Sequence, residues 1–232
     1  MGAVSEKKGK GERKVVESYK IVYEGADGEL VEKKSRFIAQ IRPVKSEEEA
    51  LAFVEETRKK YWDARHNCYA YIIKGEGATP TARCSDDGEP SQTAGKPMLD
   101  VLMGEELIDV CAVVTRYFGG TLLGTGGLVR AYSGAVKEGL ANAQILEKKQ
   151  GVRMEVTTDY NGVGKIQYLA AQEGIDTLDS QYTDKVVFIF LVPEEQEESF
   201  QAKLVESTNG RAVIRTDGEV YYGKCGGKLI LL

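Results

Sequence analysis

Three acidic side chains that could take part in chemistry lie close together in the stretch DDGEPSQTAGKP, from Asp86 to Pro97. The carboxylates of Asp86, Asp87 and Glu89 could coordinate Mg²⁺ through oxygen or act as general acids and bases. Against such a role, the two prolines stiffen the stretch, and Thr93 could cap the helix that follows. A stiff acidic segment is also a good surface for docking another protein. The residues therefore favour a binding surface or a structural turn over a metal or catalytic site.

A second candidate site is the glycine-rich stretch RYFGGTLLGTGGLVRAY, from Arg116 to Tyr132. Glycines let backbone N–H groups approach a ligand closely, and the start of a helix favours an anion. Arg116 and Arg130 flank the glycines and could neutralise a phosphate. The stretch is not a Walker motif, because Thr125 rather than a lysine follows Gly124, and its spacing does not match the dinucleotide-binding motif. The same glycines could instead serve only a tight connection between a strand and a helix.

The chain contains one histidine, His66, in the stretch DARHNCYAY. Paired with Cys68 or Cys84 it could activate a thiol nucleophile, but no third group that would orient the pair can be identified. A histidine that hydrogen-bonds the backbone at the start of a strand is the plainer interpretation. The four cysteines are scattered without a CxxC pair, and the single histidine completes no zinc-ligand spacing. We therefore expect no catalytic residue, no metal and no cofactor, and free thiols in a reducing compartment.

Strands and helices alternate around these stretches in the first half of the chain. Ser46 can cap a helix, and Glu49 three residues later completes a capping box. The apolar run DVCAVVTRYF is typical of a strand that is buried on both faces. The turn GADGE separates the first two strands, and a long loop precedes the second helix. The expected strands are 18–25, 30–41, 67–74 and 109–118; the first helix begins at 46, and the others are 97–107 and 127–146.

The second half follows the order βαββαβ, which is a ferredoxin-like unit. A strand at 150–160 precedes a helix that ends at Gly174, a normal terminal glycine. A hairpin, a second helix that stops at Gly210 and the strand 211–216 complete the unit. We expect a basic polar tail at 1–17, a first domain at 18–148, the ferredoxin-like domain at 149–216 and an extension at 217–232 that forms either an added hairpin or a loose tail.

The composition is that of a soluble globular protein, and the order of the expected strands and helices makes its fold class α+β. Apolar residues make up 42% of the 232 residues and charged residues 29%. No run of 18 apolar residues exists, and the polar N-terminus lacks the apolar centre of a secretory signal, so we expect a cytoplasmic protein without membrane contact. The net charge of −5 argues against a general coat for polyanions, although it leaves room for a local basic patch.

Three blocks of the sequence, ARHNCYAY, DDGEPSQTAGKPML and VVTRYFGGTLLGTGGLVRAYSGAV, together resemble the IMPACT family. The resemblance extends over about residues 18–216, and Gln92 departs from it where a smaller residue is commoner. It implies that the first half has the fold of the second domain of ribosomal protein S5 and that the second half is ferredoxin-like. This pair is similar to the last two domains of the ribosomal translocase. Eukaryotic members of the family bind a regulator of the amino-acid-starvation kinase and thereby restrain that kinase.

The resemblance and the residues together predict a non-enzymatic, translation-associated regulatory protein that binds RNA, the ribosome or a regulatory protein. One alternative is an enzyme or small-ligand binder that holds a phosphate-bearing substrate at Gly119–Gly127, and another is a pure protein-interaction module. We expect the acidic stretch and the glycine-rich stretch to pack side by side. The expected binding surface consists of His66, Asn67, Asp86, Asp87, Gly88, Glu89, Pro90, Thr93, Gly95, Arg116, Tyr117, Phe118, Gly119, Gly120, Gly124, Gly126, Gly127 and Arg130.

Overall fold

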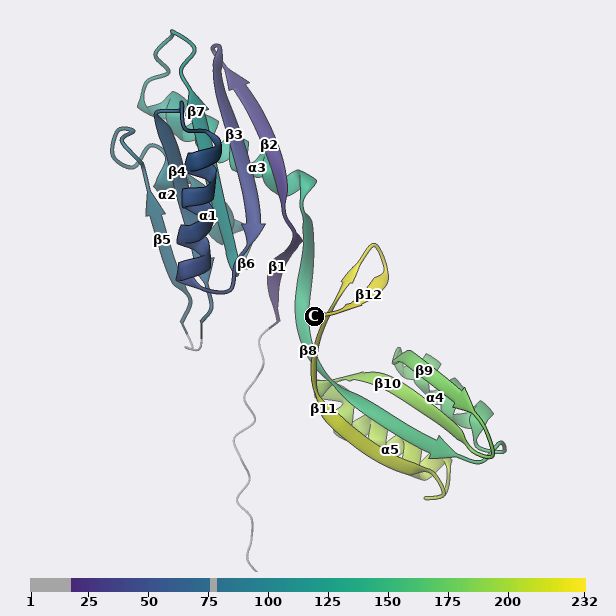
Figure 1. The fold of residues 1–232 in the computed structure, drawn as a ribbon. Helices are drawn as coiled ribbons and strands as arrows, with labels where there is room; N and C mark the ends of the chain where they lie inside the picture. The colour runs from purple at the N-terminus through teal and green to yellow at the C-terminus, as the bar shows by residue number, and fades with distance from the viewer. Residues whose placement is uncertain (1–17, 76–78) are drawn as a thin grey trace, which may run out of the picture.

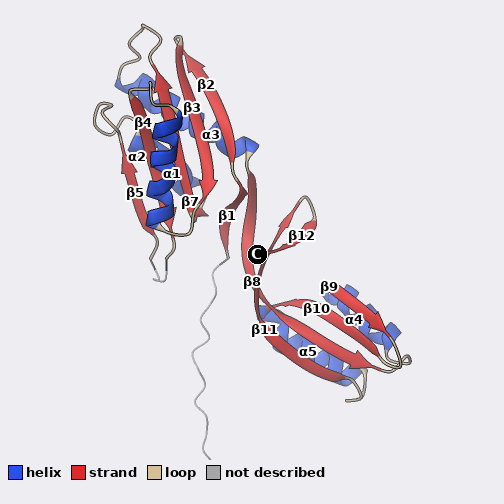
Figure 2. Cartoon of the chain, viewed as in Figure 1, coloured by secondary structure: helices blue, strands red, loops and turns tan. Residues whose placement is uncertain are grey.

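The computed structural model describes residues 18–75 and 79–232, so the tail expected at residues 1–17 lies outside the described residues. The protein is α+β with two separate sheets (Figures 1 and 2). Within the described residues, no helix is long and apolar enough to cross a membrane. The elements of the first part are β1 (Tyr19–Glu24), β2 (Ala26–Glu32), β3 (Ser35–Pro43), α1 (Glu47–Lys60), β4 (His66–Ile73), β5 (Thr81–Ser85), α2 (Gly95–Gly104), β6 (Leu107–Ile108), β7 (Val110–Tyr117) and α3 (Thr125–Asn142).

The first sheet has the strand order β2-β3-β7-β4-β5, with helices on both faces (Figure 1). Alternate side chains of β7 explain this layering, because Ala112 and Val114 pack with α2 and α3 whereas Cys111 and Val113 pack with α1. All but the last residue of β7 are buried, as its apolar run predicts. The cap expected from Ser46 on α1 is confirmed, since the backbone N–H of Glu49 donates to Ser46 Oγ at 3.1 Å. The return bond of the capping box differs from the expected one, because the Glu49 carboxylate accepts from the N–H of Lys45 and not of Ser46.

The turn expected at GADGE is wrong, and its glycines have a different purpose. The chain reverses instead at Lys33 and Lys34, which adopt positive φ angles of 46° and 67° between β2 and β3. Gly28 lies within β2, where a Cβ atom would come within 2.3 Å of the backbone nitrogen of Gly139 in α3. Glycine is therefore required at this position because the helix lies directly on the strand.

The long loop expected before the second helix contains a strand and is shorter than predicted. Residues 81–85 form β5, which pairs antiparallel with β4, and α2 already begins at Gly95. The sequence TARCS of β5 is polar and lies at the edge of the sheet, where only one partner strand is needed. It therefore lacks the apolar alternation that would have marked it as a strand.

The second part is built on a 15-residue strand, β8, that belongs to both parts of the protein. Its remaining elements are β8 (Gln144–Thr158), α4 (Val163–Glu173), β9 (Asp176–Tyr182), β10 (Val186–Pro193), a short 3-10 helix (Glu194–Gln196), α5 (Glu197–Ser207), β11 (Val213–Cys225) and β12 (Lys228–Leu231). The order βαββαβ from β8 to β11 agrees with the sequence, and the strands are arranged as β11-β8-β10-β9. A separate apolar core fills the space between these strands and the helices α4 and α5.

Hydrogen-bonded pairing runs along β8 without a break. Residues 144–148 pair with β1, whereas residues 149–158 pair with β11, β10 or both. The boundary expected between residues 148 and 149 thus lies inside a paired strand. The helix expected to reach residue 146 ends at Asn142, because β8 begins two residues later. Figure 1 shows β8 passing from the first part of the molecule into the second.

The extension at 217–232 forms the hairpin alternative. Strand β11 continues past residue 216 to Cys225, and its later residues pair with β12. The same strand pairs with the middle of β8, for example Tyr222 with Lys149. The extension therefore lies against the strand that joins the two parts of the protein.

Candidate functional site

Asp86 holds the start of α2. Its carboxylate accepts hydrogen bonds from the backbone N–H groups of Gln92, Ala94 and Gly95 at 2.7, 3.0 and 2.8 Å. The helix has no cap from its own first residue, so an aspartate eight residues earlier satisfies the free amides. The cap expected from Thr93 is not formed, because the Thr93 hydroxyl donates to the carbonyl of Pro90 at 2.6 Å.

Replacing Asp86 by alanine is expected to lower the free energy of unfolding by about 2 kcal/mol, because two amides at the start of α2 lose their acceptor. Urea denaturation of the purified protein measures this change. The control is Asp100→Ala in the same helix, where the exposed carboxylate pairs only with Lys96 and the expected loss is below about 0.5 kcal/mol. Equal losses in the two variants would contradict the capping role of Asp86.

Asp87 ties the acidic stretch to β4 and α1. One carboxylate oxygen accepts from the backbone N–H of Asn67 at 2.6 Å, and the other accepts from Arg58 at 2.9 Å. The carbonyl of Asp87 lies 2.8 Å from His66 Nδ1, so the histidine bonds the backbone at the first residue of β4, as its position predicts. The Asn67 side chain in turn accepts from the hydroxyl of Thr115 on β7 at 2.7 Å.

Glu89 is buried and joins the acidic stretch to the glycine-rich stretch. Arg116 Nη1 donates to Glu89 Oε1 at 2.6 Å, and the Tyr132 hydroxyl donates to the same oxygen at 2.8 Å. The side chains of Arg116 and Glu89 are only 8% and 3% exposed. The two stretches therefore lie side by side as expected, and the arginine is held by a carboxylate of the protein itself.

The carboxylates of Asp86, Asp87 and Glu89 each bond different partners, so they do not converge on one site. Among residues 18–75 and 79–232, no group of three or more His, Cys, Asp or Glu side chains is placed to hold a metal ion. Cys68 donates through Sγ to the carbonyl of Asp86 at 3.0 Å, and burial raises the pKa of this thiol well above its ordinary value. Burial likewise raises the pKa of the Tyr132 phenol. Both groups stay protonated at neutral pH, so Cys68 is poorly suited to act as a nucleophile.

Most of the glycines after β7 are needed for a close approach to another part of the backbone or for a positive φ angle. The N–H of Gly119 donates to Ser35 Oγ at 3.1 Å, and a Cβ at this glycine would come within 2.0 Å of the backbone of Lys34. Gly120 and Gly124 adopt positive φ angles of 84° and 71°. Helix α3 then begins at Thr125 without a side-chain cap, which leaves its first amides free.

The signature residues divide into a framework group and a surface group. The framework group is held by internal hydrogen bonds, close packing or burial and comprises His66, Asn67, Asp86, Asp87, Gly88, Glu89, Pro90, Thr93, Gly95, Arg116, Gly119 and Gly127. The surface group consists of Phe118, Gly120, Gly124, Gly126 and Arg130, with the half-buried Tyr117 beside them.

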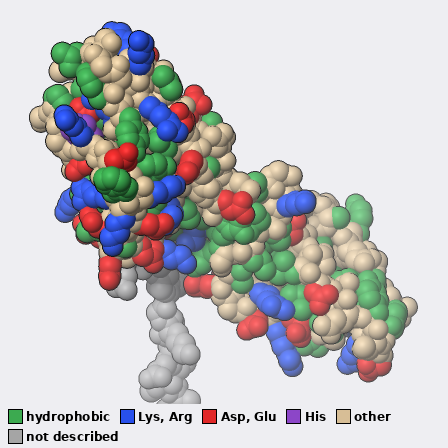
Figure 3. All heavy atoms as spheres, turned by 45° about the horizontal axis from the view of Figure 1, so that its top comes forward, with side chains coloured by type: hydrophobic (Ala, Val, Ile, Leu, Met, Phe, Trp, Pro, Cys, Tyr) green, Lys and Arg blue, Asp and Glu red, His purple; other side chains and the backbone are tan. Residues whose placement is uncertain are grey.

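Exposed side chains of mixed chemistry surround the turn between β7 and α3. A cavity of about 380 Å³ is lined by Asp63, Arg65, His66, Arg116, Tyr117, Phe118 and Leu122. Phe118 is 57% exposed and Leu122 is 84% exposed. Arg130 is exposed and lies back over Gly126 at the start of α3. We call Arg65, Phe118, Leu122 and Arg130 the turn surface. In Figure 3 the histidine, drawn in purple, has basic and hydrophobic side chains near it.

Arg65 and Leu122 were missed by the sequence reasoning, although both lie within or next to the signature blocks. So was Trp62, the only tryptophan, which is 83% exposed three residues before Arg65. Neither arginine of the turn surface forms an ion pair within the part of the chain that the structure describes. A lone tryptophan followed closely by an arginine was the available signal, since both types are common in binding surfaces.

Comparison with known protein families divides the chain into the same two parts as its separate apolar cores do. Residues 33–140 match the Impact N-terminal domain, and residues 156–211 match a domain of unknown function (DUF1949). The chain is 42% identical over 208 residues to the IMPACT family member YvyE of Bacillus subtilis (strain 168), covering 90% of this chain and 94% of that protein. It is 39% identical over 178 residues to the IMPACT family member YigZ of Escherichia coli (strain K12), covering 77% and 87%. A crystal structure of a hypothetical protein is 36% identical, with a TM-score of 0.56 over 86% of this chain and 97% of that chain.

Proposed function

Since the chain belongs to the IMPACT family, we propose that it is a non-enzymatic regulatory protein of translation that binds RNA, either free or on the ribosome. The binding site in this proposal is the turn surface formed by Arg65, Phe118, Leu122 and Arg130. The protein would act in the cytoplasm, where its RNA partner is found.

The translational setting rests on likeness of fold. The order βαββαβ with strands arranged β11-β8-β10-β9 supports a ferredoxin-like fold for the second part. The family resemblance supports a fold like the second domain of ribosomal protein S5 for the first part. The last two domains of the ribosomal translocase combine the same two folds, and this analogy is the reason for placing the protein in translation.

The observation that carries the RNA proposal is the chemistry left free at the turn surface. Asp86, Asp87 and Glu89 are occupied by internal contacts, so they are not available as catalytic or metal-binding groups. Arg65 and Arg130 remain exposed and form no ion pair within the described chain, and Arg65 lines the same cavity as the exposed ring of Phe118. Cations that bind phosphates next to an aromatic ring that stacks on a base are the groups that single-stranded RNA requires.

Electrostatics at the start of α3 add to this surface. Arg130 is the sixth residue of α3 and so lies in its second turn, not in the first as expected, but its guanidinium reaches back to Gly126 in the first turn. A cation there is unfavourable beside the amides at the start of the helix. A bound phosphate would accept from those amides and pair with the guanidinium, so it would relieve the repulsion. The net charge of −5 means that such binding depends on local groups and not on the protein as a whole.

Binding of a fluorescein-labelled single-stranded 12-mer of uridine tests the proposal, with fluorescence anisotropy measured over a range of KCl concentrations. Phe118→Ala is expected to weaken binding at least about fivefold, because one base loses its stacking partner. Arg130→Gln is expected to reduce the slope of log affinity against log salt by about one, because one phosphate contact is lost.

Lys137→Gln is the matched control, since Lys137 is an exposed cation farther along α3 and outside the turn surface. It should bind the 12-mer as tightly as the unmodified protein and with the same slope. If Phe118→Ala and Arg130→Gln also bound normally, the RNA site would be elsewhere or absent. Loss of ribosome co-sedimentation in Phe118→Ala, with unchanged affinity for the 12-mer, would point to a protein partner on the same surface.

A further inference from the structure

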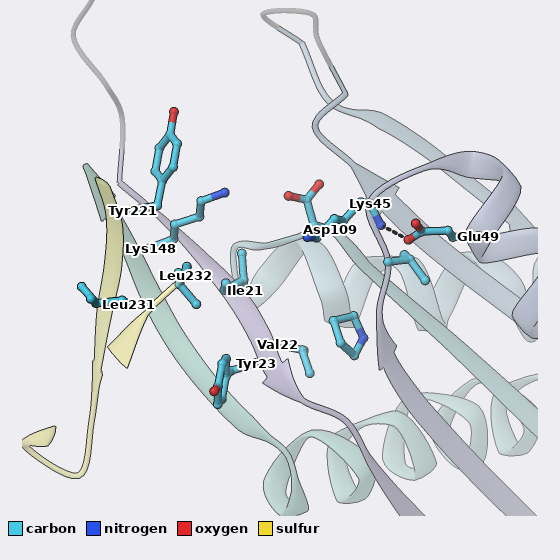
Figure 4. Close-up of a pocket in the computed structure, with 12 residues that line it drawn as sticks. Ile21, Val22, Tyr23, Lys45, Glu49, Asp109, Lys148, Tyr221, Leu231 and Leu232 are labelled. Carbon is cyan, nitrogen blue, oxygen red and sulfur yellow. Dashed lines mark hydrogen bonds between the residues drawn. The ribbon is translucent and has the colours of Figure 1, made fainter. Parts of the chain in front are cut away.

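A second and larger cavity lies where the extension meets the first part of the protein. Its volume is about 640 Å³, within the range of small-molecule sites. Apolar lining comes from β1, β11 and the end of the chain, through Ile21, Val22, Tyr23, Tyr221, Leu231 and Leu232. Figure 4 shows these side chains on one side of the cavity, with Asp109, Lys45 and Glu49 on the other.

The carboxylates of this cavity are held by backbone donors. Asp109 accepts from the N–H of Lys74 at 2.9 Å, and Glu49 accepts from the N–H of Lys45 at 2.7 Å. Both acids therefore serve the local backbone structure, one at the turn before β7 and the other at the start of α1.

The two lysine amines of the cavity have no carboxylate partner. Within the described residues, neither Lys45 nor Lys148 forms an ion pair, although the side-chain carboxylates of Asp109 and Glu49 line the same cavity. The Lys148 amine lies 4.5 Å from the ring centre of Tyr221 and 5.4 Å from that of Tyr19. The aromatic rings keep this amine in place at the cavity without neutralising its charge.

We propose that this cavity binds an anionic amphiphile, a small molecule with one carboxylate, sulfonate or phosphate group on an aromatic or aliphatic body. Lys148 binds the anionic group, with Lys45 across the cavity from it. Tyr23, Leu231 and Leu232 cover the apolar body. The ligand contacts both β1 and the hairpin of β11 and β12, so it joins the extension to the first part of the protein.

The fluorescent probe 1-anilinonaphthalene-8-sulfonate tests the site, because it carries one sulfonate on an aromatic body. We expect saturable binding of one probe per chain and displacement by decanoate but not by decanol at the same concentration. Lys148→Met is expected to weaken probe binding about tenfold, because a charged contact is lost while the unbranched side chain still packs on the tyrosines.

Lys149→Met is the matched control. Lys149 follows Lys148 in the chain, but its amine pairs with Glu147 at 3.2 Å and it does not line the cavity. The uncharged probe N-phenyl-1-naphthylamine should bind equally to the unmodified protein and to Lys148→Met. The double variant Leu231→Ser/Leu232→Ser should weaken the binding of both probes several-fold. We expect this variant to stay folded, because both leucine side chains are partly exposed.

Three results would overturn the proposal. One is the absence of saturable probe binding by the unmodified protein. Another is an equal loss of binding in Lys148→Met and Lys149→Met, which would show that only the overall charge matters. The third is normal binding of the sulfonate probe by a folded Lys148→Met protein. Thermal unfolding measured on each variant shows whether a loss of binding comes from loss of the site or from loss of the fold.

Discussion

Glu89→Gln is expected to lower the free energy of unfolding by about 3 kcal/mol, because it leaves the guanidinium of Arg116 buried without its carboxylate. The two side chains are 3% and 8% exposed, so water cannot replace the lost partner. The amide also changes the acceptor of the Tyr132 hydroxyl, which bonds the same oxygen at 2.8 Å. Urea denaturation measures the change.

Two further variants make the interpretation of Glu89→Gln specific. Glu29→Gln removes the carboxylate of an exposed pair with Arg36 and should cost less than about 1 kcal/mol. The double variant Glu89→Gln/Arg116→Met should be less destabilised than the sum of its single variants, because no buried charge remains. Additive losses would show that the pair contributes through packing and not through its charges.

Gly28→Ala is expected to destabilise the protein by about 3 kcal/mol, since the added Cβ would meet backbone atoms of Gly139 and Glu138 at 2.3–2.7 Å. Backbone atoms cannot rotate away as the end of a side chain can, so α3 must move off the sheet. That movement would also disturb Tyr132, which lies on the same helix. The midpoint of thermal unfolding measures the effect.

Gly104→Ala is the control for this glycine. It lies at the end of α2, where an added Cβ would meet no atom within 4 Å, and its φ angle is not positive. This substitution should leave stability unchanged or raise it by about 0.5 kcal/mol, because it restricts the unfolded chain. A Gly28→Ala protein as stable as Gly104→Ala would contradict the close approach of α3 to β2.

The sequence predicts elements well where one local rule governs them. The helix cap by Ser46 and the doubly buried run of β7 depend on neighbouring residues, and both are confirmed. The turn between β2 and β3 was misplaced because a glycine needed for close packing looks the same in sequence as a glycine needed for a turn. Only the facing helix, more than 100 residues away, distinguishes the two uses of Gly28.

The candidate site follows the same division. Three sequence blocks predict that the acidic and glycine-rich stretches meet, and the bond between Arg116 and Glu89 joins them. The partners of the individual carboxylates, such as Arg58 for Asp87, could not be predicted, because they depend on how α1 crosses the sheet. Phe118 was expected on the binding surface, but the exposure of Leu122 could not be predicted, since apolar residues beside a buried strand are usually part of the core.

The unbroken pairing along β8 gives the protein a particular mechanical character. The bonds between β1 and β8 lie perpendicular to the strands, so a pull along β8 from the second part loads all of them together, in shear. Breaking them one after another would require a force across the sheet instead. A force applied to the second part is therefore transmitted directly to the first part. The connection through β8 resists extension much more strongly than a flexible linker would.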